Sequence, residues 1–398
     1  MRAPGVPAPA ARRAGPLLAG LALAAGFVAL WGGSALGSLG VDAGVNLAPW
    51  DAELQRRAAL AALGKGDEAG ARRLALRSLQ AMPFNQSSLT IVALNTSGAR
   101  AVNSTNIAAG LGWRDPLTNG RLVAAAVNEG APDIAAQRIE AIGRISEDGR
   151  RTGIMADRLL LMPGGTEALA VRAAHHLGRG WIPDWLATPP ASPQVAAARL
   201  AFIRLLESDD GAWSRQVIGQ AMAGFTKAGD PAMAYAAWRG SVKRADMFGG
   251  QIYDPRFVAI PDDFPVGGEW LRASEQLIGV TPVSGGGLRL DAMAGASGRV
   301  ISQMVRYGTG RHEIVTELSG DEPLVQSLRW TVQCVPGGNV PVTRTLTRTA
   351  AGWQDRHVFD VPQGCDVGYV ALVATVRVNQ DSTATVNSVA LNPAGPAR

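Results

Sequence analysis

The chain has 398 residues, of which 47% are hydrophobic, with 38 basic against 33 acidic side chains. A chain of this length and hydrophobicity can fill two or three cores, which excludes an intrinsically disordered protein. The net charge of +5 is dispersed, and no segment carries the dense lysine and arginine patch of a nucleic-acid-binding domain. Lys65, Lys227 and Lys243 are the only lysines, and this arginine bias is typical of a GC-rich bacterial genome.

The N-terminal segment, residues 1–41, predicts export. Arg12 and Arg13 precede an uncharged run from Ala14 to Val41. About 20 apolar residues cross a hydrocarbon core of about 30 Å, and Leu17 to Leu36 supplies that number. The arginines favour a cytoplasmic N-terminus, so we expect a single-pass inner-membrane protein with its bulk in the periplasm.

Two interpretations of this segment stay open. We favour an uncleaved anchor, because the run is longer than an ordinary signal-peptide core and Trp31 would lie at the outer interface. The alternative is a secretory signal peptide that is cleaved near Ala35–Gly37. Both export the chain, so Cys334 and Cys365 would meet an oxidising environment.

Residues 50–250 predict a helical domain. Leu54, Ala58 and Ala61 share one face of a first helix, a Gly-Lys-Gly-Asp turn follows, and a second helix ends before Pro83. The turn marker at Asp67 recurs at Asp133, Thr166 and Asp230, at separations close to one or two periods of roughly 34 residues. This arrangement resembles a tetratricopeptide-type repeat, and the resemblance implies a surface for partner proteins.

Several side chains of the helical domain have both a functional and a structural interpretation. Trp113, Trp181 and Trp185 would either line a peptide or glycan site or fill gaps between helical pairs, and we favour the second. His175 and His176 point about 100° apart on a helix and do not chelate one metal together. We expect no metal and no cofactor.

Residues 251–264 are rich in Pro, Gly and Asp and are expected to link the helices to a β-domain of residues 265–398. Short β-type runs separated by turn signals predict an antiparallel β-sandwich or jelly roll. The runs cover residues 286–293, 298–307, 310–320, 326–334, 341–349, 355–362, 367–379 and 383–392. The expected fold class is therefore multidomain, α then β.

The order of these runs resembles a jelly roll of the carbohydrate-binding-module type over about residues 262–392. The resemblance is carried by Trp270, the Ser302-Gln303 pair, a strand that begins at Gly310, the Trp330-x-x-x-Cys334 strand and the closing "VNSVALN". It implies that one sheet face contacts a glycan.

Period-two alternation assigns a face to each side chain of "SLRWTVQC". Leu328, Trp330, Val332 and Cys334 should face the core, while Arg329, Thr331 and Gln333 face outward. If the outward face is concave, a polar row would bind sugar hydroxyls and an aromatic ring would stack on the sugar; a solvated face is the alternative. The candidate ligand-binding residues are Gln303, Tyr307, Arg329, Thr331, Gln333, Trp353 and Arg377.

Cys334 and Cys365 predict a structural disulfide, which would contribute roughly 3.5 kcal/mol by the loop-entropy relation. His312 and His357 are the histidines that a thiol catalyst would need, but no local signature of a cysteine nucleophile is present. The motifs of serine hydrolases, zinc peptidases, phosphate-binding loops and dinucleotide-binding domains are also missing.

The combination predicts a non-enzymatic periplasmic or cell-surface accessory protein of exopolysaccharide or envelope-glycan assembly. The helical repeats would bind a protein partner and the β-sandwich a polysaccharide. One alternative is a protein–protein adaptor without a glycan ligand. Another is a polysaccharide lyase or hydrolase, which would need two carboxylates across a cleft.

Overall fold

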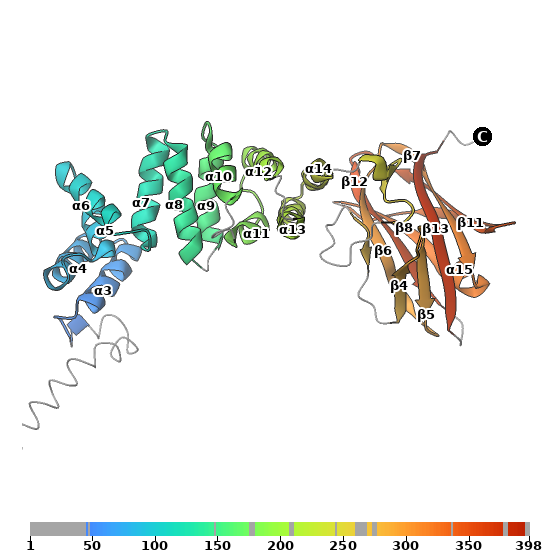
Figure 1. The fold of residues 1–398 in the computed structure, drawn as a ribbon, viewed down its shortest axis with the longest axis horizontal. Coiled ribbons are helices and arrows are strands. Elements are labelled where there is room, and N and C mark those ends of the chain that lie inside the picture. The colour runs from blue at the N-terminus through green and yellow to red at the C-terminus, as the bar shows by residue number, and fades with distance from the viewer. Residues whose placement is uncertain are drawn as a thin grey trace, which may run out of the picture. The chain divides into compact units, whose positions relative to one another are not determined.

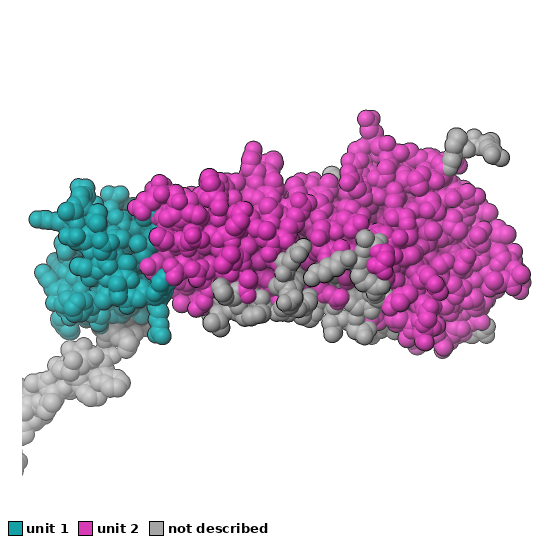
Figure 2. Space-filling view, turned by 45° about the horizontal axis from the view of Figure 1, so that its top comes forward, with its two compact units in different colours: residues 1–125 teal, residues 126–398 magenta. Residues whose placement is uncertain are grey.

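The computed structural model describes residues 45–46, 48–146, 149–174, 180–206, 211–242, 245–258, 269–272, 277–335, 337–376 and 381–394. The predicted anchor, His175–His176 and Arg377 lie outside these residues. Within the described ranges, no helix combines the length and hydropathy needed to cross a bilayer. The chain forms two compact units, residues 1–125 and residues 126–398 (Figure 2).

The first unit is an array of helical hairpins. Its helices are α3 (Ala52–Gly64), α4 (Glu68–Ala81), α5 (Gln86–Leu94), α6 (Ala99–Gly110) and most of α7 (Pro116–Asn128). The predicted first hairpin is confirmed, and the Asp67 carboxylate begins α4 by accepting a hydrogen bond from Gly70 N at 2.8 Å. The core is built from small side chains, with Ala59, Ala71 and Ala75 fully buried, so neighbouring helices approach closely.

The second unit begins with a helical array of its own. Its helices are α8 (Pro132–Ile145), α9 (Gly149–Leu160), α10 (Gly165–Ala174), α11 (Trp181–Leu186), α12 (Pro193–Leu205), α13 (Gly211–Lys227) and α14 (Pro231–Ser241). The turn marker at Asp230 is the N-cap of α14, since its carboxylate accepts a hydrogen bond from Met233 N at 2.9 Å.

Trp181 and Trp185 fill gaps between helices, as expected, and both are buried. A Cβ at Gly153 would lie 2.3 Å from the Trp185 ring, so only glycine lets α9 pack there. The Trp185 indole donates to Asp157 at 3.0 Å, and the buried Arg199 guanidinium pairs with the same carboxylate at 2.8 Å. The cluster joins α9, α11 and α12.

The C-terminal part is an antiparallel β-sandwich (Figure 1). The six-stranded sheet has the order β10-β11-β7-β13-β5-β4, and the five-stranded sheet has the order β3-β6-β12-β8-β9. The strands of the two sheets are β3 (Leu271–Arg272), β4 (Ile278–Pro282), β5 (Leu288–Ala292), β6 (Ser297–Arg306), β7 (Gly310–Gly320), β8 (Leu328–Cys334), β9 (Asn339–Val340), β10 (Val342–Thr349), β11 (Gly352–Val361), β12 (Val367–Thr375) and β13 (Ser382–Pro393). The short helix α15 (Glu322–Ser327) precedes β8. The eight predicted runs are β5 to β8 and β10 to β13.

The sandwich core confirms the alternation predicted for β8. Leu328, Trp330, Val332 and Cys334 are buried, whereas Arg329 is exposed. The Trp330 indole donates to the Thr316 hydroxyl of β7 at 2.7 Å, which joins the two sheets. This indole therefore satisfies its polar group inside the core instead of offering a platform to a ligand.

The last helix of the array packs on the sandwich, which explains why the second unit contains both. The two-stranded ribbon β1 (Phe248–Gly249) and β2 (Ile252–Tyr253) follows α14. The ring of Trp238 in α14 packs on the rings of Phe248 and Tyr253, with centroid separations of 5.8 and 5.7 Å. The Gln303 amide of β6 binds both the N–H and the carbonyl of Tyr253, which fixes the ribbon to the five-stranded sheet.

Candidate functional site

The candidate site is the outward face of β8 and β12 in the five-stranded sheet. In the register of these strands, Gln333 lies opposite Tyr369, and Arg329 lies opposite Val373. Two neighbouring strands extend the face, because Asn339 of β9 pairs with Gln333 and Arg299 of β6 pairs with Val373. We call Arg299, Arg329, Thr331, Gln333, Asn339 and Tyr369 the β8–β12 face.

Tyr369 is the aromatic residue of this face. Its side chain is half-buried, and the next outward position on β12 is the small Ala371. Burial raises the pKa of the Tyr369 hydroxyl, and the positive charge of Arg299 opposes that rise. The phenol and the Arg299 guanidinium are therefore within electrostatic range of each other, although their residues are four positions apart in the register.

Two arginines make the face electropositive. Arg329 donates to the carbonyl oxygens of Gln326 and Leu328, which orients its guanidinium at the start of β8. Arg299 of β6 and Arg329 of β8 both lie opposite Val373, on the two sides of β12. No described outward position of β6, β8 or β12 carries a carboxylate. A ligand that binds here therefore meets cationic and amide donors, which suit an anionic or hydroxyl-rich polymer.

A pocket of about 330 Å³ lies at the end of the sandwich where β8 finishes. Its polar lining includes Asn339, Asp360 and Gln363, and its apolar lining includes Pro341 and Pro362. Asn339 belongs both to this pocket and to the β8–β12 face. A chain-like ligand could thus contact the face and the pocket together.

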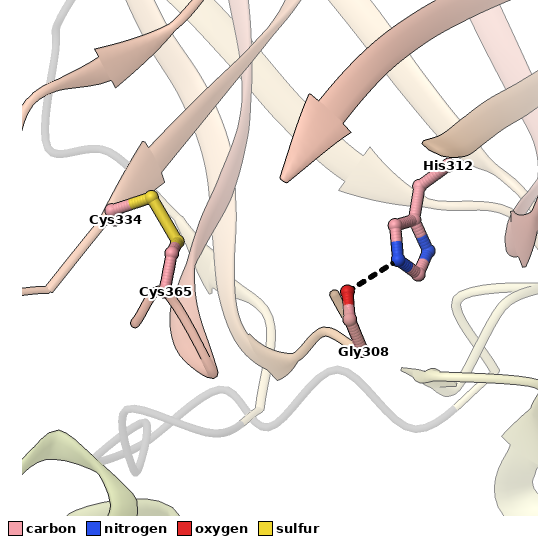
Figure 3. Close-up of a disulfide and its surroundings, with 4 residues drawn as sticks. All are labelled: Gly308, His312, Cys334 and Cys365. Atoms are coloured by element: carbon pink, nitrogen blue, oxygen red, sulfur yellow. Dashed lines mark hydrogen bonds between the residues drawn. A yellow bond between two sulfur atoms is a disulfide. The ribbon is translucent and has the colours of Figure 1, made fainter. Parts of the chain in front are cut away.

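The predicted disulfide is confirmed. Cys334 and Cys365 are joined with an S–S distance of 2.00 Å and a Cα–Cα distance of 5.5 Å, and both line the pocket. The bond ties the end of β8 to the loop before β12. His312 instead makes a hydrogen bond with the Gly308 carbonyl at 2.6 Å (Figure 3). The structure thus assigns the cysteines a supporting role beside the candidate site.

The structure brings together only some of the predicted ligand-binding residues. Arg329, Thr331 and Gln333 share the β8–β12 face. Gln303 and Tyr307 lie in the core instead, with exposed fractions of 0% and 3%. Gln303 pairs with Val370, whose side chain faces inward, and this pairing of β6 with β12 cannot be read from alternation within one strand.

The remaining two candidates lie elsewhere. Trp353 belongs to β11 of the other sheet, where it packs partly against the core and under Arg348. Arg377 lies outside the described residues. Sequence reasoning missed Arg299, Asn339 and Tyr369 as site residues, because only the strand order shows that β12 lies between β6 and β8 and that Arg299 and Arg329 flank Val373.

A second cluster of titratable groups is buried between the sheets. Arg344 donates to Asp355 at 2.7 Å, and the His357 ring accepts a hydrogen bond from Trp330 N at 3.2 Å. Burial and then the Arg344 charge lower the pKa of His357 to about 4, while burial raises the pKa of Asp355 despite Arg344. Asp355 and His357 are almost fully buried. The hydrogen bond from Trp330 N to His357 joins the two sheets, whereas Arg344 and Asp355 pair within the six-stranded sheet.

Across the described part of the chain, no group of three or more histidine, cysteine or acidic side chains is placed to hold a metal ion. Comparison with known proteins finds no family model and no curated protein that matches this chain. The chain is therefore classified by its own structure, as a helical array followed by an antiparallel β-sandwich.

Proposed function

We propose that this protein is a non-enzymatic accessory factor of the bacterial cell envelope that holds an acidic polysaccharide on the β8–β12 face. In this proposal residues 1–41 anchor the chain in the inner membrane, and the helices and the sandwich lie in the periplasm. The same proposal holds that the helices are of the tetratricopeptide-repeat type and that the sandwich is of the carbohydrate-binding-module type.

The observation that carries the proposal is the half-buried Tyr369 on β12, four residues from Val373, which lies between Arg299 of β6 and Arg329 of β8. An aromatic ring offers an apolar surface to the C–H groups of a sugar, while guanidinium groups bind carboxylates with two hydrogen bonds. Gln333 and Asn339 add amide groups for hydroxyls at one end of the same face. A polymer of uronic acids carries the C–H surface, the carboxylates and the hydroxyls that these groups bind, at regular spacing.

The test is binding of the full chain, purified in detergent, to polygalacturonate, with neutral dextran as the comparison polymer. Arg299→Ala and Arg329→Ala each remove one cation from the face and should weaken binding by about tenfold, the value of one charge-assisted hydrogen bond. Arg289→Ala is the matched control, because Arg289 is exposed on the other sheet and pairs with Asp291.

An equal loss of binding in all three arginine variants would mean that the affinity for polygalacturonate depends on net charge alone, and it would contradict the proposal. Absence of binding by the unaltered chain would contradict it for uronate polymers. Tyr369→Ala, with both arginines intact, separates ring stacking from charge, since its effect should persist at high salt.

One observation favours the alternative of a protein–protein adaptor. The helices of the second unit and the turn after α9 expose Ile134, Ile154, Leu161 and Val171, with more than half of each side chain accessible. Exposed apolar side chains of this size suit a protein partner. The adaptor would bind such a partner on the helices whether or not polysaccharide is present, and loss of glycan binding would leave it unaffected.

A further inference from the structure

The aromatic residues of the first unit are distributed in an unusual way. Trp50, Phe84 and Trp113 are the aromatic side chains among its described residues, and they are 59%, 73% and 42% exposed. Large aromatic residues normally fill a core. Here the core is built from alanine and isoleucine instead, so the aromatic residues serve some other contact.

Hydrogen bonds show that α3, α4 and α5 meet at one end of the unit. The Ser78 hydroxyl, in the last turn of α4, donates to the Ala52 carbonyl at the start of α3 at 2.9 Å. The same hydroxyl accepts a hydrogen bond from Ser88, in the first turn of α5, at 3.0 Å. Trp50 precedes α3 and Phe84 connects α4 with α5, so both residues lie at this end.

The end of α6 is held at the same place. The Gln86 amide, in the first turn of α5, donates to the carbonyls of Ala108 and Gly112, each at 2.8 Å. Trp113 follows directly, and the exposed Met82 and Leu111 stand in the same connections. We call Trp50, Met82, Phe84, Leu111 and Trp113 the aromatic end.

The chain also reaches the predicted anchor from this end. Nine residues lead from Val41, the last residue of the uncharged run, to Trp50. Even when fully extended, nine residues span only about 30 Å. If residues 1–41 are anchored as proposed above, the aromatic end lies within that distance of the membrane surface.

The charges around the aromatic end suit anionic lipid headgroups. Its carboxylates are already engaged, because Asp51 caps α3, Glu53 pairs with two arginines of its own helix and Asp115 accepts two hydroxyl hydrogen bonds. Arg77 and Arg114 are exposed nearby. Arginine side chains close to a bilayer are attracted to anionic phospholipids.

We propose that the aromatic end rests in the headgroup region of the bilayer, so that the first unit contacts the lipid surface directly. Trp50, Phe84 and Trp113 would occupy the interface, where aromatic rings are favoured, and the arginines would bind lipid phosphates. This contact rests on the proposed anchor, and it gives the helical array a second attachment to the membrane.

The test places a fluorescent label at each end of the first unit. Phe84→Cys is labelled with the nitrobenzoxadiazole fluorophore and compared with Val102→Cys, which is 57% exposed in the first turn of α6, away from the aromatic end. The native cysteines are bonded to each other and do not take the label. The full chain is reconstituted into phosphatidylethanolamine–phosphatidylglycerol vesicles with or without brominated acyl chains.

Brominated lipid should lower the fluorescence of the label at residue 84 by about twofold and leave the label at residue 102 nearly unchanged, because quenching acts only near the bilayer. If the protein floats with the vesicles but residue 84 is not quenched, or both labels are quenched alike, the lipid contact is overturned and the anchor stands. If the protein does not float, both the anchor and the contact are overturned.

Discussion

The first unit and the β-sandwich bury apolar surface with opposite choices of side chain. The helices of the first unit meet through Ala59, Ala71 and Ala75, and their aromatic residues are exposed. The sandwich encloses Trp270 and Trp330, whose rings are 6.0 Å apart, and adds a disulfide. Small residues allow close helix packing with little surface for each side chain, whereas two sheets about 10 Å apart leave room for large rings.

This contrast predicts that removing a tryptophan lowers the free energy of unfolding much more in the sandwich than in the first unit. Trp330→Ala should lower the free energy of unfolding of the sandwich by about 3–5 kcal/mol, because it leaves a cavity and an unpaired Thr316 hydroxyl. Hydrogen exchange of the β8 amides measures the loss. Trp50→Ala is the control and should change stability by less than about 0.5 kcal/mol; comparable losses for the two variants would contradict the contrast.

The disulfide should stabilise the sandwich alone. Replacing Cys334 and Cys365 together by alanine should cost roughly 3.5 kcal/mol, since the bond closes a loop of 31 residues. Urea unfolding followed by hydrogen exchange reports each region separately. We expect faster exchange in β8 and β12 and unchanged exchange in α3 and α4, and the idea fails if the helices respond equally.

Acid should also act on the sandwich first. The pKa of His357 is lowered to about 4 in the folded protein, so the unfolded chain binds a proton more readily as the pH falls below about 6.5. Stability is therefore complete above that pH and should decline by about 1.4 kcal/mol per pH unit as the pH approaches 4. The raised pKa of Asp355 acts in the opposite sense at pH values above 3.8, so a variant that removes only the His357 titration is needed to separate the two groups.

His357→Gln tests this cause. Glutamine keeps a neutral acceptor for the Trp330 N–H but does not titrate. The free energy of unfolding of this variant should change less with pH between 5 and 6.5. The slope should fall by up to about 1.4 kcal/mol per pH unit, which corresponds to one bound proton. An unchanged slope would assign the pH dependence to other groups.

The first unit should be more sensitive to added volume than to removed volume. Ala71→Leu places three further carbon atoms between α3 and α4, where Ala71 is fully buried, and should cost about 1–3 kcal/mol. Leu76→Ala, on the exposed side of α4, is the control and should have almost no effect. Thermal unfolding followed by exchange of α3 and α4 amides distinguishes them.

Local patterns predicted the elements well and the site only in part. The eight β-runs and the first helical hairpin could be read from periodicity, caps and turns, because these signals lie within a few residues. Gln303 and Tyr307 were placed on the wrong side, since the face of β6 depends on its register with β12, in which Gln303 pairs with the inward-facing Val370.

The sequence by itself determined that helices precede strands, that β8 alternates between core and surface, and that the two cysteines can pair in an exported chain. Only the tertiary structure decided that Arg299 and Arg329 lie on either side of β12, the strand of Tyr369, and that three scattered aromatic residues lie at one end of the first unit. The physical reason is distance along the chain. Periodicity and capping act over a few residues, whereas these groupings depend on strand order and on helix ends held together by side-chain hydrogen bonds.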